Sequence, residues 1–331
     1  DTYGIMLPYT PLHFLLLQEI PLVVATSANE RESPILKDES EEVAGLADCI
    51  LTHNRPIANR CDDSVVRVFR SAPLFLRRAR GYVPDPLWLP GIRKQRSILA
   101  LGAEMKNTVT LLKDGYLVTS QYLGDMNDLR NLAYMEEALE RFRELFSAEP
   151  AMVCCDLHPG FTTTRLAERT GKPVIRVQHH IAHVFAVMAE HGLDPHGNYL
   201  WVAFDGPGYG DDGCIWGGEF FALNGMRAQQ RWHFRYVPQP GGDLAAREPW
   251  RMALSYLRDA SGEIPRVGIL HDIADEKIRA VTRALEVGIN APLTSSVGRL
   301  FDAVAALTGL APTRMDYEAE AAMRLESPVE P

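Results

Sequence analysis

Two histidines, His179 and His183, stand four residues apart in the apolar stretch VQHHIAHVFAV, residues 177–187. On a helix, side chains at this spacing share one face, so two imidazole nitrogens can approach one cation. His180 stands where a zinc protease has its general-base glutamate, and the chain contains no HExxH sequence, so that class of enzyme is excluded. The structural alternative is that these histidines are hydrogen-bonded polar groups at the rim of a core helix.

A carboxylate, Asp205, follows the apolar run LWVAF and opens the segment DGPGYGDDG. We expect Asp205 to end a strand and to face the same cleft as the histidines. Two imidazoles and one carboxylate suit iron(II), zinc or manganese better than calcium. The sequence therefore predicts a catalytic metal site made of His179, His183 and Asp205.

Several glycine-rich or polar turns are typical of a site for phosphate. Backbone amides in glycine-rich turns can approach phosphate oxygens closely, and a helix N-terminus attracts an anion. Facing loops on two lobes can hold ATP through its phosphates, with Mg²⁺. The residues predicted to contact the nucleotide are Lys106, Asn107, Gly206, Gly208, Gly210, Gly218, Glu219, Ser295, Gly298 and Asp302. Plain hairpin turns and helix capping by serine are the structural alternatives, and Asp302 can instead face solvent.

A second polar set lies in the first 80 residues, in loops that follow or precede strand-like runs. The forked guanidinium of arginine suits phosphate or carboxylate, so these loops predict a pocket for an acyl phosphate or a nucleoside triphosphate. A solvated basic turn is the alternative. The residues of this predicted pocket are Ser27, Asn29, Arg60, Asp62, Arg77, Arg78 and Arg80.

Alternating strand and helix patterns must position these residues, which indicates an α/β fold. The run GYVPDPLWLPGIRKQR contains three prolines and is typical of an extended connector. We therefore predict two domains, residues 1–91 and 92–331, with a boundary near residue 92. A strand-rich pattern begins near residue 97 and again near Tyr199, which favours two similar lobes in the second domain.

The expected elements follow from apolar periodicity and turn residues. Strands are predicted over residues 21–29, 64–69, 72–78, 151–156, 173–178 and 199–204, with a hairpin turn at Lys113–Gly115. Helices are predicted over residues 37–48, 132–146, 162–171, 179–187, 248–259, 274–288, 296–309 and 317–326.

Composition limits the classes of partner. The chain has 331 residues, 46% of them hydrophobic, and a net charge of −9, which argues against wholesale wrapping of nucleic acid. Its apolar runs fall short of the ~20 residues that a membrane span needs. The five cysteines include no C-x-x-C pair, so neither a zinc ribbon nor a disulfide framework is indicated. We expect a cytoplasmic protein with no nucleic-acid or membrane partner.

Short motifs follow one another in a fixed order along the chain. ATSAN, NRCDDSVVR and RRARGYVP come first, and LGAEMKNTVTL, VQHHIAH, FDGPGYGDDGCIWGGEF and SSVGRLFDAVAAL follow. In this order they resemble the HypF family of hydrogenase-maturation carbamoyltransferases, truncated at both ends. The resemblance implies a partial YrdC-like α/β domain followed by a two-lobed domain of the actin-like ATPase (ASKHA) type.

The resemblance also implies an activity. The family makes a carbamoyl-adenylate from carbamoyl phosphate and ATP and passes the carbamoyl group to the C-terminal cysteine of the partner HypE. By motif, His179, His183 and Asp205 match ligands of a divalent metal, iron or zinc. The glycine-rich and Lys106–Asn107 turns match the nucleotide cleft, and the polar set before residue 81 matches the adenylation pocket.

Three other interpretations stay open. One is an O-carbamoyltransferase acting on a small molecule, although those relatives order the two domains the other way round. Another is a non-catalytic scaffold that keeps the fold and binds a partner. A tRNA-modifying relative shares both folds, but the acidic balance and the HHIAH form favour the hydrogenase branch.

Overall fold

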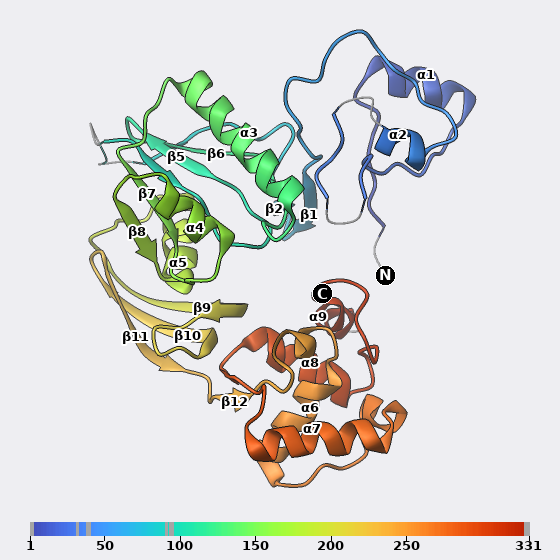
Figure 1. Cartoon of the computed structure of the whole chain (residues 1–331), viewed down its shortest axis with the longest axis vertical. Helices are drawn as coiled ribbons and strands as arrows, with labels where there is room; N and C mark the ends of the chain where they lie inside the picture. Colours follow the sequence, from blue (N-terminus) through green and yellow to red (C-terminus); the bar gives the residue numbers. More distant parts are fainter. Residues whose placement is uncertain (1–2, 31–32, 38–40, 90–91, 93–95, 328–331) are drawn as a thin grey trace. The chain divides into compact units, whose positions relative to one another are not determined.

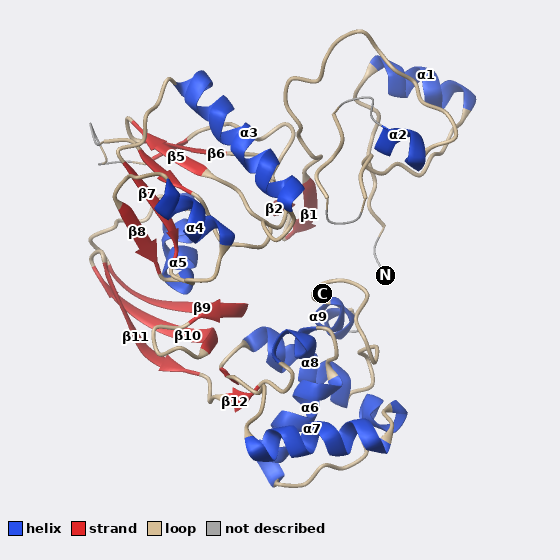
Figure 2. Ribbon diagram, viewed as in Figure 1, coloured by secondary structure: helices blue, strands red, loops and turns tan. Residues whose placement is uncertain are grey.

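The computed structural model describes the chain except residues 1–2, 31–32, 38–40, 90–91, 93–95 and 328–331. The chain forms two compact units, Asp1–Ile175 and Arg176–Pro331. Each unit combines helices with a β-sheet, which confirms the predicted α/β class (Figures 1 and 2). The predicted domain boundary near residue 92 stays a prediction, and residues 90–91 and 93–95 beside it lie outside the described residues.

The first unit begins with α1 (Pro11–Glu19), α2 (Glu41–Leu46) and the antiparallel pair β1 (Val65–Phe69) and β2 (Ala72–Arg77). Helix α1 starts where Thr10 Oγ1 accepts the backbone N–H of His13, with proline at the first helical position. The strand predicted over residues 21–29 is wrong. This segment forms no strand: the Ala28 carbonyl accepts from Leu36 N at 2.9 Å, but the segment belongs to no sheet among the described residues, and Val24 is fully exposed.

A six-stranded sheet has the order β3-β6-β5-β4-β7-β8. Its strands are β3 (Leu87–Trp88), β4 (Ile98–Ala100), β5 (Thr110–Lys113), β6 (Tyr116–Thr119), β7 (Met152–Asp156) and β8 (Val174–Val177). The predicted hairpin is confirmed, since Asp114 and Gly115 both have positive φ between β5 and β6. The predicted connector is wrong at β3, because Leu87 and Trp88 pair with β6 and the Trp88 ring packs on Tyr116.

Helices α3 (Leu129–Phe146) and α4 (Thr162–Arg169), both of which were predicted, pack on this sheet. Asp128 caps α3 by accepting the N–H of Arg130, and the buried residues Tyr134, Met135 and Phe142 face the core. The same core takes in Leu101, Leu111, Val118 and Val153 from the strands. This packing fixes α3, whose polar face contributes to a cavity described below.

The second unit is built on α5 (His179–Glu190) and a five-stranded sheet. Its strands are β9 (Asn198–Tyr209), β10 (Ile215–Asn224), β11 (Arg227–His233), β12 (Val237–Pro238) and β13 (Leu293–Thr294). Val184 and Met188 of α5 pack against Ala203, Phe221 and Leu223 of the sheet. This contact brings the histidine helix to β9.

The remaining helices follow the predicted pattern. They are α6 (Trp250–Ser261), α7 (Asp275–Val287), α8 (Val297–Leu307) and α9 (Glu320–Glu326), with the short 3-10 helices Gly242–Ala246 and Gly268–Asp272 between them. They share a core of Leu254, Leu270, Val281 and Ala306. No helix in the described part of the chain is both long and apolar enough to cross a membrane.

The prediction that Asp205 ends a strand is wrong, because β9 runs on to Tyr209. Tyr209 pairs with Ile215 and Gly208 with Trp216, whereas Phe204 pairs with Gly218. Residues 205–207 therefore lie opposite Gly217 alone, and the strand bulges there. A bulge re-aims the side chains that it carries, which is how Asp205 reaches the histidines from within a strand.

Candidate metal centre and phosphate-binding residues

Helix α5 places His179 and His183 one turn apart. The helix begins at His179 because Gln178 caps it, its Oε1 accepting the backbone N–H groups of His180 and Ile181. The ring centroids of His179 and His183 lie 4.8 Å apart, and their Nε2 atoms 3.2 Å. The predicted shared face is present in the structure.

Asp205 completes the group. Its Oδ2 lies 3.1 Å from His179 Nε2 and 3.6 Å from His183 Nε2, and one ligand atom from each of the three residues falls within 4.8 Å of the others. Oδ1 accepts the N–H of Gly206, whereas Oδ2 is buried without a well-formed hydrogen bond in the described part of the chain. Two imidazole nitrogens and an unsatisfied carboxylate oxygen fit a divalent cation such as iron or zinc.

The electrostatics of this group favour an ionised carboxylate. Burial raises the pKa of Asp205, but the neighbouring His179 and His183 outweigh it and hold that pKa far below its usual range. His180 is fully buried, and burial together with His179 lowers its pKa to about 4, so its ring is neutral at neutral pH. The sequence reasoning gave His180 no role.

Most of the glycines that were predicted to contact phosphate are packed closely against other atoms of the protein. A Cβ on Gly208 would lie 2.4 Å from His180 Cε1, one on Gly210 would lie 2.3 Å from Trp216 Nε1, and one on Gly218 would lie 2.4 Å from the carbonyl of Ser295. Of these four glycines, only Gly206 has no atom within 4 Å of the position that a Cβ would take. Close packing therefore explains three of them, and their contact with nucleotide stays a prediction.

We expect Gly208→Ala to weaken metal binding, because the new methyl group displaces the His180 and His179 rings. The loss should approach the roughly 10–100-fold that disturbing the surroundings of metal ligands costs. Titration with Zn²⁺ measures it. Gly206→Ala is the matched control for metal binding, and equal affinities for the two variants would contradict the prediction.

Glu219 and Ser295 form a buried internal network. Glu219 Oε1 accepts from Gly217 N, Gly218 N and Ser295 Oγ, and its Oε2 accepts from Gln230 Nε2. Ser296, beside them, caps α8 and donates to the carbonyl of Asp205 at 3.0 Å. These contacts fix the start of α8 against the strand that carries the candidate metal ligand.

Asp302 and Gly298 lie on α8. Asp302 is only 1% exposed, so it does not face solvent, and its Oδ2 lies 2.9 Å from Arg299 Nη2. Burial raises the pKa of Asp302 to about 6, against the opposing effect of Arg299. A Cβ on Gly298 would lie 3.2 Å from Gly206 Cα, so this glycine allows helix and strand to approach.

Lys106 and Asn107 lie in the first unit. Lys106 has positive φ and its N–H donates to Asp125 Oδ1 at 2.7 Å. Asn107 is buried, and its amide donates to the carbonyls of Leu101 and Ala103. Asn107 therefore shapes the turn, and the exposed Lys106 is the member of this pair that is accessible.

Four of the predicted adenylation residues meet at one cavity of about 250 Å³: Ser27, Asn29, Asp62 and Arg77. Ser27 Oγ donates to Asn29 Oδ1 at 2.5 Å, and Arg77 Nε donates to the carbonyl of Asp63. Burial raises the pKa of Asp62, with Arg77 opposing it. A hydroxyl, an amide, a carboxyl and a guanidinium thus line a single hollow.

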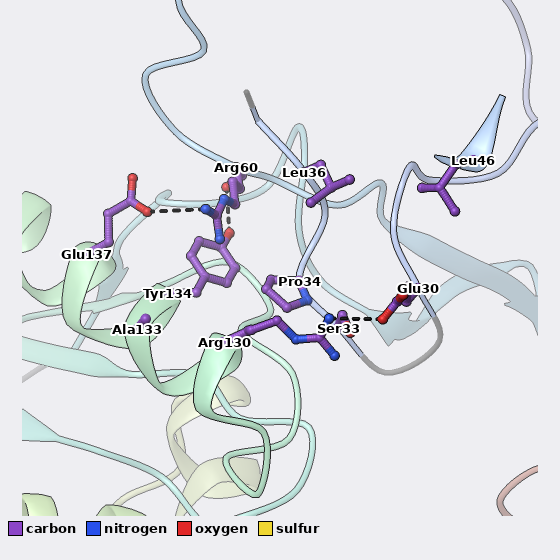
Figure 3. Close-up of a pocket in the computed structure, with 10 residues that line it drawn as sticks. All are labelled: Glu30, Ser33, Pro34, Leu36, Leu46, Arg60, Arg130, Ala133, Tyr134 and Glu137. Carbon is purple, nitrogen blue, oxygen red and sulfur yellow. Dashed lines mark hydrogen bonds and ion pairs between the residues drawn. The ribbon is translucent and has the colours of Figure 1, made fainter. Parts of the chain in front are cut away.

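The other three arginines have different positions. Arg60 lines a neighbouring cavity of about 270 Å³, where its guanidinium lies over the ring of Tyr134 and near Glu137 of α3 (Figure 3). Arg78 donates to the carbonyl of Tyr82, and Arg80 donates to the carbonyl of Cys61 and pairs with Asp63. Arg78 and Arg80 thus hold the surrounding loops and line neither cavity.

The structure adds lining residues that the sequence reasoning missed. Tyr134 lines both cavities, and Tyr122 lines the smaller one, where Arg77 lies over its ring. Nothing in the local sequence marks them, because both look like ordinary aromatic residues of a core. Their place depends on contacts between segments more than 40 residues apart.

Family models match three successive stretches of the chain. Residues 1–79 match a YrdC-type model described as "Telomere recombination", residues 93–190 match "HypF Kae1-like domain", and residues 201–330 match "Carbamoyltransferase, Kae1-like Domain, second subdomain".

Curated relatives match over nearly the whole chain. Carbamoyltransferase HypF of Rhizobium leguminosarum bv. viciae is 38% identical over 98% of this chain and 43% of its own length. The Rhodobacter capsulatus HypF is 43% identical over 98% of this chain and 44% of its own length. The chain therefore spans less than half the length of these relatives.

Two solved structures share the fold. A crystal structure of full-length HypF in the phosphate- and nucleotide-bound form gives a TM-score of 0.92 at 39% identity, covering 99% of this chain and 43% of that one. A crystal structure of T.kodakarensis HypF gives a TM-score of 0.87 at 36% identity, covering 97% of this chain and 44% of that one. The chain therefore belongs to the HypF carbamoyltransferase family.

Proposed function

We propose that this chain carries the carbamoyl-transfer region, and part of the adenylation region, of an ATP-dependent carbamoyltransferase. The convergence of His179, His183 and Asp205 on one point carries this proposal, since these three side chains could hold the divalent ion that we assign to the transfer step. The HypF relatives, which are named carbamoyltransferases, support it. We assign carbamoyl phosphate and ATP with Mg²⁺ as the substrates, and the C-terminal cysteine of HypE as the acceptor.

The chemistry has two stages. Carbamoyl phosphate first loses inorganic phosphate to water, which leaves carbamate. Carbamate is a poor acyl donor, whereas its mixed anhydride with AMP has a good leaving group, so a carbamate oxygen then bonds to the α-phosphorus of ATP, which forms carbamoyl-adenylate and releases pyrophosphate. The acceptor thiolate then bonds to the carbamoyl carbon as the bond to AMP breaks. An iron or zinc ion, when bound, stabilises negative charge as a Lewis acid.

Residues of this chain have separate parts in the proposal. His179, His183 and Asp205 hold the ion. In the first unit, Arg77 and the Ser27–Asn29 pair bind phosphate or carbamate oxygens in their cavity. A HypF crystal structure described as phosphate- and nucleotide-bound supports a nucleotide in this family. The five cysteines are free thiols, which suits the reducing cytoplasm where we place the reaction.

We expect an enzyme of the relatives' full length that contains this chain to exchange labelled pyrophosphate into ATP only when carbamoyl phosphate is present. Arg77→Ala should lower this exchange by roughly 10–100-fold, the value of one charge-assisted hydrogen bond of ~1.5–3 kcal/mol. Arg70→Ala, in the exposed turn between β1 and β2, is the control.

Pyrophosphate exchange that does not depend on carbamoyl phosphate would contradict the adenylation chemistry. Absence of exchange from a folded enzyme would instead favour the non-catalytic scaffold. Mass measurement of a HypE C-terminal peptide then tests the acceptor, since a transferred carbamoyl group adds a defined mass to its cysteine.

A further inference from the structure

The hydrogen bonds of Gln178 determine which way its side-chain amide oxygen and nitrogen point. Its Oε1 accepts the backbone N–H groups of His180 at 2.7 Å and Ile181 at 3.1 Å. Because an amide oxygen accepts and an amide nitrogen donates, these two capping bonds assign the oxygen to the helix. The nitrogen points the other way and donates to the carbonyl of Tyr209 at 3.1 Å.

This orientation fixes where the His180 ring carries its proton. Gln178 Nε2 lies 3.2 Å from His180 Nδ1, and because Nε2 is a donor, Nδ1 must accept. In an imidazole whose Nδ1 accepts a hydrogen bond, the proton is on Nε2. The helix cap therefore selects the tautomer of a fully buried ring.

The Nε2–H group of His180 faces Asp205. It lies 3.8 Å from Asp205 Oδ2, longer than a hydrogen bond, and neither atom has a hydrogen-bond partner among the residues that the structure describes. A buried donor without an acceptor costs free energy, so a small rotation of the carboxylate that brings Oδ2 within hydrogen-bonding distance of His180 Nε2 is favoured. Gly208 lies close to Cε1 and Nε2 of the ring and limits its movement.

We propose that Gln178 and His180 form a positioning relay that orients Oδ2 of Asp205 toward an ion held by His179 and His183. The inference rests on the metal site proposed above. His180 is not itself a ligand in this arrangement, because a protonated Nε2 has no lone pair for a cation. Partners of this kind around a metal site orient the ligands and tune affinity.

Two replacements of His180 distinguish the role of its Nε2 atom from that of its Nδ1 atom. The amide of Gln is as many bonds from Cβ as Nε2 is, so His180→Gln keeps a donor toward Asp205. The amide of Asn reaches only as far as Nδ1, so His180→Asn keeps a partner for Gln178 and loses the donor. His196→Ala removes an exposed histidine from the loop before β9 and serves as the control.

The experiment titrates Co²⁺ into the metal-free 331-residue chain and records the visible spectrum and the thermal midpoint of each metal-free variant. We expect His180→Asn to bind Co²⁺ about 10–100-fold more weakly than the parent. His180→Gln and His196→Ala should stay within about threefold, and the cobalt band should keep its position and intensity in all of them, because the ligands are unchanged.

Any other outcome contradicts either the metal site or the proposed role of His180. A parent chain that binds no Co²⁺ removes the metal site, and the relay with it. If the parent and His180→Asn bind Co²⁺ equally well, the metal site stands and the relay is contradicted. Equal weakening in both variants, with lower thermal midpoints, gives His180 a packing role instead. A shifted or weakened band in His180→Gln makes His180 a ligand.

Discussion

Replacing His179 with alanine is expected to abolish stoichiometric metal binding by this chain. His179 Nε2 is the imidazole nitrogen nearest Asp205 Oδ2, at 3.1 Å. Its removal leaves one imidazole and one carboxylate, and two ligands hold iron or zinc poorly in competition with water. The affinity should fall by more than the ~10–100-fold that loss of an outer partner costs. His183→Ala should have the same effect.

Two measurements check this result. Elemental analysis after dialysis gives the metal content, with about one ion per chain expected for the parent. Thermal unfolding with added Zn²⁺ gives a second readout, since a ligand at 100 times its Kd stabilises the fold by about 2.7 kcal/mol. The parent should show this rise and His179→Ala should not. Identical metal content in His179→Ala, His183→Ala and the parent would remove the site.

The local parts of the candidate site were predictable from sequence because their geometry is local. A spacing of four on a helix fixes that His179 and His183 share a face, whatever the rest of the fold does. The hairpin at Asp114–Gly115 followed in the same way from residues that tolerate positive φ. Helix positions were predictable for similar reasons, since apolar periodicity in α6 to α8 reports directly which face is buried.

The position of Asp205 was only half predictable. Its type and its place after an apolar strand suggested a ligand, but the reason given, a strand end, was wrong. Asp205 reaches the histidines because three residues of β9 bulge opposite Gly217, and a bulge depends on how two strands pair. The sequence of one strand does not contain that information.

The glycine-rich turns show a different limit. Glycine is needed wherever other atoms approach the backbone closely, and the approaching atoms can belong to a ligand or to the protein. At Gly208 and Gly218 the near atoms are those of His180 and Ser295. Ser27, Asn29, Asp62 and Arg77 were predicted to share a pocket, but Tyr122, which also lines this cavity, was out of reach because it joins them only through tertiary contacts.

The second large effect concerns stability. Glu219 is completely buried, and its two oxygens accept from four groups: two backbone amides, a serine hydroxyl and a glutamine amide. Glu219→Ala leaves all four donors without this acceptor, and a buried unsatisfied donor costs ~1–3 kcal/mol. Partial relaxation reduces the sum, so we expect the free energy of unfolding to fall by about 3–5 kcal/mol.

Glu219→Gln separates hydrogen bonding from the loss of the side chain. Its oxygen can still serve Gly217, Gly218 and Ser295, and Gln230 can turn its own oxygen toward the new amide. This variant should therefore lose only about 1 kcal/mol, near the net value of one hydrogen bond. Glu263→Ala, at an exposed position, should change stability by less than about 0.5 kcal/mol. Urea unfolding ranks the three variants. If the alanine variant were as stable as the glutamine variant, the hydrogen bonds of Glu219 would not be what holds β10 to the segment before α8.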